Sequence, residues 1–417
     1  MSIRKRTWTT AKGEKKTSWV VDYVDGKGTR RLKTFAKKKD ADQFAATAKV
    51  EVREGVHVAD SASVTVKAAG EFWIATATSA GLERGTIVQY RQHLARHITP
   101  AIGETLLSKL TVPTVRSFED QLRAGGVSSS MVRKILTSLG SLLADAQERG
   151  LVVRNPVREK SRARQKGKDR RQERRHRGKL KVGVDIPARD EIKAIVGALV
   201  GRWRPILLTA IFTGLRASEL RGLRWSDVDV DRAEIYVRQR ADRFNDIGRP
   251  KSEASERTVP MPPLVANTLR EWRLACPRPR TGEKDAAGAW LIEEMRPEQL
   301  AFPNGQGKVE SLSNIMQRGF LPAEVAAGVA IETGEKDSAG KSVVRPKYTG
   351  LHSLRHFYAS WCINRRKDGG LGLPPKMVQE RLGHSSITLT MDTYGHLFPR
   401  DDDAAELAAA ESLLLGP

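Results

Sequence analysis

Cysteine and long apolar runs are both scarce in this chain of 417 residues. The two cysteines, Cys276 and Cys362, lie far apart and form no CxxC or histidine-paired spacing. This argues against a disulfide framework and a metal site and favours a reducing cytoplasm. No apolar segment approaches the ~20 residues that a membrane helix needs. The basic N-terminus, MSIRKRTWTTAKGEKK, lacks the apolar stretch of a secretory signal, so we expect a cytoplasmic protein.

Acidic residues are too few to balance the basic ones. The chain has 72 Lys and Arg against 49 Asp and Glu, a net charge of +23 and a pI of about 10.2. The electric field of this positive charge attracts polyanions, and nucleic acid is the leading candidate for the binding partner. An anionic membrane surface is a weaker one, because no basic amphipathic helix with a strong apolar face stands out. With 39% hydrophobic residues, the length predicts two to four globular domains.

The N-terminal residues 1–60 are typical of a small basic sheet with one helix. Residues 18–24 and 29–35 alternate as strands around the turn signal DGKG. A helical stretch follows over about 38–54 and ends at a glycine. The basic residues of this sheet could bind a partner, or they could simply form a solvated sheet face.

The pattern then changes to helical spacing, which predicts a four-helix module with helices at 64–78, 86–98, 111–123 and 129–149. Residues 157–181 carry 13 Lys and Arg against 3 Asp and Glu, which predicts a linker that contacts phosphates or is simply solvated. The largest predicted domain follows, with surface insertions at 277–289 and 329–345.

Three motifs in that domain place charged side chains beside apolar helices. In AIFTGLRASEL, Arg216 and Glu219 share one helical face after an apolar run, which favours a buried role over a surface ion pair. In LHSLRHFYAS, His352 and Arg355 lie at the start of a mostly apolar helix, where anions are favoured. In PKSEASERTVP, Lys251 opens a predicted strand–turn–strand, a place where a lone lysine ordinarily faces solvent.

The C-terminal segment LGHSSITLTMDTYGH holds His384 and Tyr394 among small polar residues. We expect Ser385 and Ser386 to start a short helix just after His384. A tyrosine in such a helix is most often a structural residue with its ring in the core. Its hydroxyl can also attack phosphorus and be held covalently. Ionising a phenol of pKa ~10 at neutral pH costs about 4 kcal/mol. We expect Arg216 and Arg355 to lower that cost and to hold the oxygens of one phosphodiester, without a metal ion.

Taken together, these segments resemble the catalytic domain of tyrosine recombinases, the phage integrase family. TGLRASEL, the lysine of PKSEASERTVP, AFPNGQG, LHSLRH and LGHSSITLTMDTYGH occur in the family's order. The resemblance implies a multidomain α+β chain with a mainly α catalytic domain of the DNA breaking–rejoining fold, which carries a small sheet. The implied parts are an arm-type DNA-binding domain of sheet and helix at 1–60, an all-α SAM-like core-binding domain at 61–156, a basic linker at 157–184, the catalytic domain at 185–400 and a tail at 401–417.

The resemblance also implies a role for each matching residue. Each is expected to contact the DNA phosphate or to lie beside a residue that contacts it. The implied roles are Arg216 and Arg355 as catalytic arginines, Glu219 as the acid that orients the first of them, His352 as partner of Arg355, His384 as a phosphate donor, Lys251 as general acid toward the 5′-hydroxyl, and Tyr394 as nucleophile. His396 follows the nucleophile and is not expected to be essential.

The implied function is a site-specific recombinase that integrates, and also excises, a prophage or genomic island through a 3′-phosphotyrosyl intermediate. The implied partners are double-stranded DNA attachment sites, further copies of the chain in a homotetramer on DNA, a host DNA-bending protein and an excisionase. No cofactor is expected, and the implied location is the cytoplasm of a bacterial host, at the nucleoid. Two alternatives are a type IB topoisomerase-like DNA-relaxing enzyme and a non-catalytic DNA-binding relative.

Overall fold

The chain forms two compact units, Met1–Arg177 and Gly178–Pro417, and each is described by itself. The computed structural model describes residues 1–10, 14–25, 28–53, 63–165, 179–250, 252–287, 290–336, 340, 342–399 and 403–416. Among these residues, no helix has both the length and the apolar character to cross a membrane.

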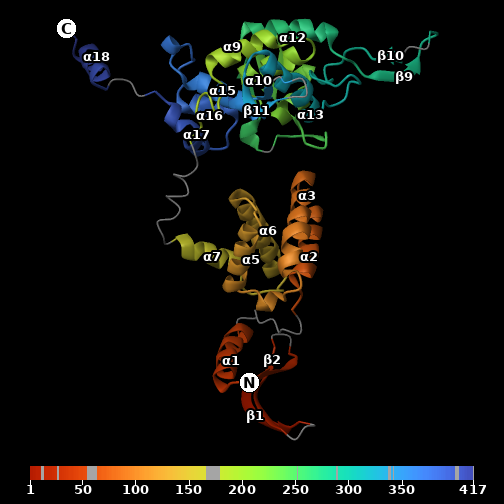
Figure 1. Cartoon of the computed structure of the whole chain (residues 1–417), viewed down its shortest axis with the longest axis vertical. Coiled ribbons are helices and arrows are strands. Elements are labelled where there is room, and N and C mark those ends of the chain that lie inside the picture. The colour runs from red at the N-terminus through yellow and green to blue at the C-terminus, as the bar shows by residue number, and fades with distance from the viewer. Residues whose placement is uncertain are drawn as a thin grey trace. The chain divides into compact units, whose positions relative to one another are not determined.

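The first unit begins with a three-stranded antiparallel sheet and a helix: β1 (Ser2–Thr9), β2 (Lys15–Val24), β3 (Arg30–Phe35) and α1 (Lys38–Arg53) (Figure 1). Alternate side chains of β2, Val21 and Tyr23, are buried against Ala41 and Ala45 of α1, as the two-residue period of a strand requires. The two predicted strands and the predicted helix are confirmed. β1 was not predicted, because its sequence SIRKRTWT is mostly polar and its place is set by backbone pairing with β2.

An all-helical group follows in the same unit: α2 (Val66–Ser79), α3 (Arg84–His93), α4 (Thr99–Ile102), α5 (Val112–Ala124) and α6 (Ser129–Glu148). Its core includes Phe118 and Leu139, both fully buried. Thr65, Thr111 and Ser128 cap α2, α5 and α6, since each hydroxyl accepts a hydrogen bond from a first-turn backbone N–H. The four predicted helices are confirmed, and the second continues beyond α3 as a π-helical turn.

The start of the expected linker is a helix instead. α7 (Pro156–Gln165) packs against α5 and α6 and buries Lys160, whose ammonium pairs with Glu119 of α5. Asn155 precedes the helix and fixes its start, because its side-chain amide donates to the Gly140 carbonyl at 2.8 Å. The helix was not predicted because the segment was judged by its charge alone. Pro156 favours a first helical turn, and the apolar stem of Lys160 allows this residue to enter the core. The expected linker residues 166–178 lie outside the described residues.

The second unit is mainly helical: α9 (Arg189–Ala198), α10 (Trp203–Thr213), α11 (Ala217–Gly222), α12 (Pro263–Ala275), α13 (Leu312–Asn314), α14 (Leu321–Ala326), α15 (His352–Ile363), α16 (Pro375–Leu382), α17 (Ile387–Tyr394) and α18 (Asp403–Leu415). The core of this unit is organised around α10, whose residues 205–211 are buried and which packs against α12 and α15. Because α10 is apolar on all sides, it lies inside the unit rather than at its surface.

Short strands complete the second unit. A three-stranded antiparallel sheet has the order β4 (Val228–Asp229), β5 (Glu234–Val237), β8 (Arg257–Pro260). Three two-stranded pairs are β6 (Arg240–Ala241) with β7 (Ile247–Gly248), β9 (Arg280–Lys284) with β10 (Trp290–Ile292), and β11 (Ala330–Lys336) with β12 (Ser342–Pro346). The last two pairs lie in the predicted insertions or directly after them, since β10 begins one residue beyond the first predicted range. Most of their described side chains are exposed.

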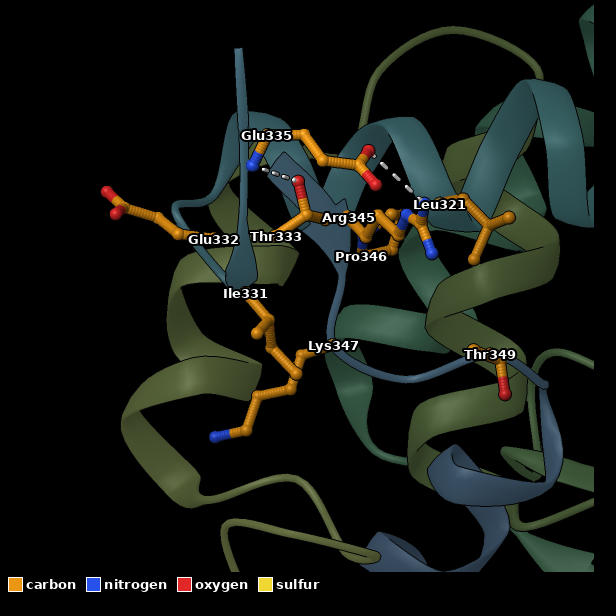
Figure 2. Close-up of a pocket in the computed structure, with 9 residues that line it drawn as sticks. All are labelled: Leu321, Ile331, Glu332, Thr333, Glu335, Arg345, Pro346, Lys347 and Thr349. Atoms are coloured by element: carbon orange, nitrogen blue, oxygen red, sulfur yellow. Dashed lines mark hydrogen bonds and ion pairs between the residues drawn. The ribbon is translucent and has the colours of Figure 1, made fainter. Parts of the chain in front are cut away.

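The β11–β12 pair fixes the segment that leads into α15. Figure 2 shows its base, where a pocket of about 530 Å³ is lined by residues including Ile331 and Lys347. Lys347 and Tyr348 both bond Glu191 of α9, the ammonium at 2.5 Å and the phenol hydroxyl at 2.6 Å. The Tyr348 backbone N–H donates to Glu324, which is fully buried. These contacts hold the chain in place shortly before His352 begins α15.

Candidate active site

The C-terminal end of α16 gathers three arginines that are far apart in the sequence. Its last carbonyls have no partner within the helix and form the negative end of the helix dipole, so they attract cations. Gly383, at φ +62°, ends the helix in the left-handed conformation. Three successive carbonyls accept from three guanidinium groups: Arg381 O from Arg257 Nε at 2.7 Å, Leu382 O from Arg355 Nη2 at 2.5 Å, and Gly383 O from Arg216 Nη2 at 2.8 Å.

Glu219 joins two of these arginines. Its carboxylate accepts from Arg216 Nη1 at 2.7 Å and from the Arg216 backbone N–H at 2.9 Å, and it also pairs with Arg257 Nη2 at 2.9 Å. Only 2% of Glu219 is exposed. Burial raises the pKa of its carboxyl, but the charge and hydrogen bonds of Arg257 and Arg216 outweigh burial and hold the pKa below its usual value. The pair predicted on one face of this helix is therefore a buried network rather than a surface ion pair.

Arg355 is the most deeply buried of the three guanidinium groups. It lies on the first turn of α15 with 2% exposure, and besides Leu382 it donates to the Gly214 carbonyl at 2.6 Å. Burial, followed by the charges of Arg216 and Arg257, lowers the pKa of Arg355. Gly214 ends α10 at φ +61°, and a Cβ there would lie 2.3 Å from the Tyr358 ring. Glycine is thus required at the turn whose carbonyl anchors the arginine.

Two of the predicted histidines flank this cluster. His352 begins α15 and is exposed; partial desolvation and the charges of Arg355 and Arg216 lower its pKa. His384 is 8% exposed, and its Nδ1 lies 2.9 Å from the hydroxyl of Thr390. Burial and the neighbouring arginines lower the pKa of His384 to about 3, so its ring is neutral at pH 7. A neutral ring with one nitrogen held by a hydroxyl keeps the other for a ligand.

Tyr394 is the last residue of α17, which begins after Ser386, a cap whose hydroxyl accepts from the Leu389 backbone N–H at 3.3 Å. The expected helix after His384 is therefore confirmed. The Tyr394 side chain is 1% exposed, its ring lies parallel to that of His384 at 6.3 Å, and its hydroxyl lies 2.7 Å from His356 Nδ1.

Burial, which the sequence did not indicate, raises the pKa of Tyr394 to about 12. Arg355 and Arg216 lower this pKa, as expected, but by less than burial raises it. Ionising the phenol at pH 7 would then cost roughly 7 kcal/mol, at ~1.36 kcal/mol for each pKa unit. In the free chain, the two arginines therefore do not make the tyrosine an anion, and the phenol keeps its proton at pH 7.

The structure thus places Arg216, Glu219, His352, Arg355, His384 and Tyr394 in one network of contacts and electrostatic interactions. Lys251 lies outside the described residues, so its predicted place is a matter for experiment. His396, which was not expected to be essential, donates through Nε2 to the Leu180 carbonyl at 2.7 Å and so ties the segment after Tyr394 to the start of the unit.

Sequence reasoning missed two members of the network. Arg257 lies in the PKSEASERTVP motif but was given no role, yet its side chain is 6% exposed and bridges Glu219 to the end of α16. No role was predicted for His356, although it directly follows Arg355 in the motif LHSLRH and contacts the Tyr394 hydroxyl. A signal for His356 existed in the four-residue helical spacing from His352, which brings the two rings to a centroid distance of 4.5 Å.

The chain also matches a known protein family. Residues 188–400, more than half of the chain, match the family described as the phage integrase family. The chain belongs to the phage integrase family. It is a site-specific tyrosine recombinase, and so a DNA strand-exchange enzyme.

Related sequences include proteins named as tyrosine recombinases and proteins named as integrases. The recombinase is 25% identical to a XerC-like tyrosine recombinase of Caldanaerobacter subterraneus subsp. tengcongensis, over 84% of this chain and 83% of that protein. It is 24% identical to the ICEBs1 integrase of Bacillus subtilis, over 73% and 72%. It is 23% identical to the integrase of Mycobacterium phage L5, over 97% and 98%.

Solved structures share the fold. The integrase of transposon Tn1549, in complex with a circular intermediate DNA, superposes with a TM-score of 0.58 at 16% identity, covering 84% of this chain and 100% of that one. A lambda integrase dimer bound to a COC′ core site gives a TM-score of 0.51 at 17% identity, covering 95% and 97%. The predicted fold class, a multidomain α+β recombinase with a mainly helical catalytic part, is confirmed.

Proposed function

We propose that the recombinase integrates, and excises, a mobile element by a reaction in which Tyr394 becomes covalently joined to DNA. The Tyr394 hydroxyl would attack the phosphorus of a DNA strand, form a 3′-phosphotyrosyl bond and release a 5′-hydroxyl. The observation that carries this proposal is the position of the phenol, which is buried beside His384 and interacts electrostatically with both Arg216 and Arg355. Five of the six residues expected in catalysis share that network.

The arginines are suited to hold the phosphodiester. Arg216 keeps 34% of its side chain exposed, so its guanidinium is accessible to a phosphate while Glu219 and Gly383 fix its direction. Arg355, which is buried, adds a second positive charge near the phosphate. Two guanidinium groups can stabilise the negative charge that develops on the phosphorane-like transition state. His352 and His384 would donate to the same oxygens. Lys251 would protonate the departing 5′ oxygen, so that a neutral hydroxyl leaves.

Parts of the chain away from this site would bind and align the DNA. In this proposal residues 61–156 and 185–400 hold the core site, the basic residues 157–184 follow phosphates, and residues 1–60 bind accessory arm sites. The net charge of +23 supports binding along a polyanion. Four copies would act together on two duplexes. In support, a lambda integrase of the same fold is known as a tetramer bound to a Holliday junction, with a TM-score of 0.50.

A role in integration is favoured over a role in resolving chromosome dimers because the match to a phage integrase extends over nearly the whole chain. The phage L5 integrase matches nearly the whole chain, including the N-terminal sheet and helix. A host DNA-bending protein and an excisionase would set the direction of the reaction. The site of action would be the bacterial nucleoid.

Recombination between two DNA molecules tests this function. Plasmids that carry the two attachment sites, mapped from the repeat that flanks the inserted element, would be incubated with purified recombinase. We expect a joined product that requires both sites and is absent with Tyr394→Phe. Relaxation of a single supercoiled plasmid without joined product would instead favour a topoisomerase. DNA binding with neither product would favour a non-catalytic relative.

A further inference from the structure

The proton of the buried phenol has one evident acceptor among the described residues. His356 lies on α15, and its Nδ1 is 2.7 Å from the Tyr394 hydroxyl, a short hydrogen bond for this pair of groups. In the tautomer that carries its proton on Nε2, the imidazole accepts at Nδ1 and the phenol donates. This arrangement brings an imidazole nitrogen that can accept a proton into contact with the atom expected to attack phosphorus.

The position of His356 is also fixed by the site. It follows Arg355, whose guanidinium is anchored on the Gly214 and Leu382 carbonyls, so the backbone of this turn cannot shift independently of the arginine. Its ring meets the ring of His352 at 80° with centroids 4.5 Å apart, and the ring of Tyr394 at 64° with centroids 5.7 Å apart. The imidazole is thus held between a residue expected to bind phosphate and the tyrosine.

We propose that His356 is a further catalytic residue, the general base that accepts the proton of Tyr394 during strand cleavage. The inference rests on the proposed role of Tyr394 as nucleophile. In the step, the phenol oxygen forms a bond to phosphorus and its proton passes to His356 Nδ1, which gives an imidazolium. The bond from phosphorus to the 5′ oxygen breaks, its electron pair stays on that oxygen, and Lys251 supplies the proton that makes a hydroxyl. Rejoining reverses each transfer.

The charges around His356 decide its protonation. His352 and Arg355 face it from its own helix, Asp185 acts on it from the segment before α9, and Tyr394 faces it from α17. Burial, then His352 and Arg355, lower the pKa of His356 to about 4, and Asp185 opposes them. Because the pKa is lowered, the ring is a neutral base throughout the neutral range. A bound DNA phosphate adds negative charge beside Arg355, which makes protonation of the ring easier as the reaction proceeds.

The decisive variant is His356→Asn, whose amide oxygen can accept a hydrogen bond near the Nδ1 position but cannot take up a proton. Single-turnover cleavage of a nicked suicide substrate by the full chain would be followed between pH 6 and 9. The wild type should show a nearly flat rate. The variant should cleave about 100-fold more slowly at pH 7, within the range expected for loss of a general base. Its rate should rise about tenfold for each pH unit, because it then depends on the small phenolate fraction.

Matched controls separate proton transfer from positioning. His396→Asn makes the same change two residues beyond Tyr394, away from the reacting oxygen, and should keep the flat profile. A substrate with sulfur in place of the 5′ leaving oxygen needs no proton on the leaving group. It should rescue Lys251→Ala but not His356→Asn. Thermal unfolding and DNA affinity close to wild type would show that the His356 variant is folded.

Each outcome has a distinct meaning. A His356→Asn variant that matches the wild-type rate at every pH overturns the proposal. A variant that is slow with a flat profile assigns His356 a positioning role and overturns the proton transfer. A wild type that forms no covalent adduct, while binding DNA, contradicts the nucleophile assignment itself, so the two failures are distinguishable.

Discussion

Replacing Glu219 by Gln should destabilise the catalytic unit by a measurable and pH-dependent amount. The substitution keeps the shape of the side chain but removes its charge and turns one oxygen into an NH₂ group. That NH₂ group would face a guanidinium donor, because both carboxylate oxygens now accept from arginines. At least one of these hydrogen bonds would be lost, and the Arg257 charge, on a side chain that is 6% exposed, would lose its counter-ion.

The size of the loss follows from the burial of the two arginines. Removing one partner of a buried ion pair costs about 3–5 kcal/mol. Arg216 is one-third exposed, so its part of the pair is screened by water and adds little. Arg257 keeps its bonds to the Arg381 and Ser255 carbonyls, which limits its loss. We therefore expect the free energy of unfolding to fall by about 3 kcal/mol at pH 7, near the lower end of that range.

The pH dependence gives a second check. The pKa of Glu219 is lowered in the folded chain, so its stabilising contribution is present above the unfolded value of 4.5. It is lost as the pH falls through the folded pKa, which lies below that value. Urea denaturation of the full chain, followed by tryptophan fluorescence, would measure the variant and the wild type at pH 7 and at acidic pH. The difference between them should shrink in acid.

Glu271→Gln is the matched control. Glu271 is an exposed residue of α12, and its substitution should change the free energy of unfolding by less than about 0.5 kcal/mol. A loss below about 1 kcal/mol for Glu219→Gln at pH 7 would refute the argument that a buried carboxylate binds the arginine cluster together. So would a difference that stays the same in acid.

Four further variants test the arginine contacts, two glycines and the N-terminal module. Arg355→Lys keeps the charge but loses the planar guanidinium whose two Nη atoms bond the Gly214 and Leu382 carbonyls, so single-turnover cleavage should fall by about 100-fold. Near-normal cleavage would contradict the proposed role of Arg355 in holding the phosphate. Gly383→Ala and Gly372→Ala should each cost about 1–2 kcal/mol in urea denaturation, since both glycines have positive φ. Only the first should impair cleavage, because its Cβ would lie 2.8 Å from Arg257 Nη1; equal impairment would contradict this. Deletion of residues 1–58 should spare cleavage of the core site and weaken integration, and equal loss of both would argue against a separate arm module.

Local features of the fold could be predicted because they depend on residues close in the sequence. The helix that ends at Tyr394 follows from the serine cap at Ser386, and the turn after α10 follows from Gly214. β1 could not be predicted in this way. Its strand is fixed by pairing with β2, and its sequence lacks the alternation of apolar and polar residues that indicates a strand with one buried face.

The motif residues predicted for the site, apart from Lys251, lie together in the structure. Arg257 was not predicted among them, because it meets Glu219 from 38 positions away and the Arg381 carbonyl from 124 positions away. Contacts between residues so far apart in the sequence can be identified only from the fold, which brings them together at the C-terminal end of α16. The high pKa of Tyr394 was missed because the sequence indicates which cations lie near the phenol, while the degree of burial depends on the assembled core.

The most direct test of the central claim is the identity of the residue that carries DNA. A nicked suicide substrate, which traps the intermediate because the released strand end diffuses away, would be incubated with the wild type, and the adduct digested and sequenced by mass spectrometry. The account predicts a nucleotide remnant on Tyr394, formed without added metal ion, and no adduct with Tyr394→Phe. A remnant on any other residue, or an adduct that persists in the Phe variant, would contradict it.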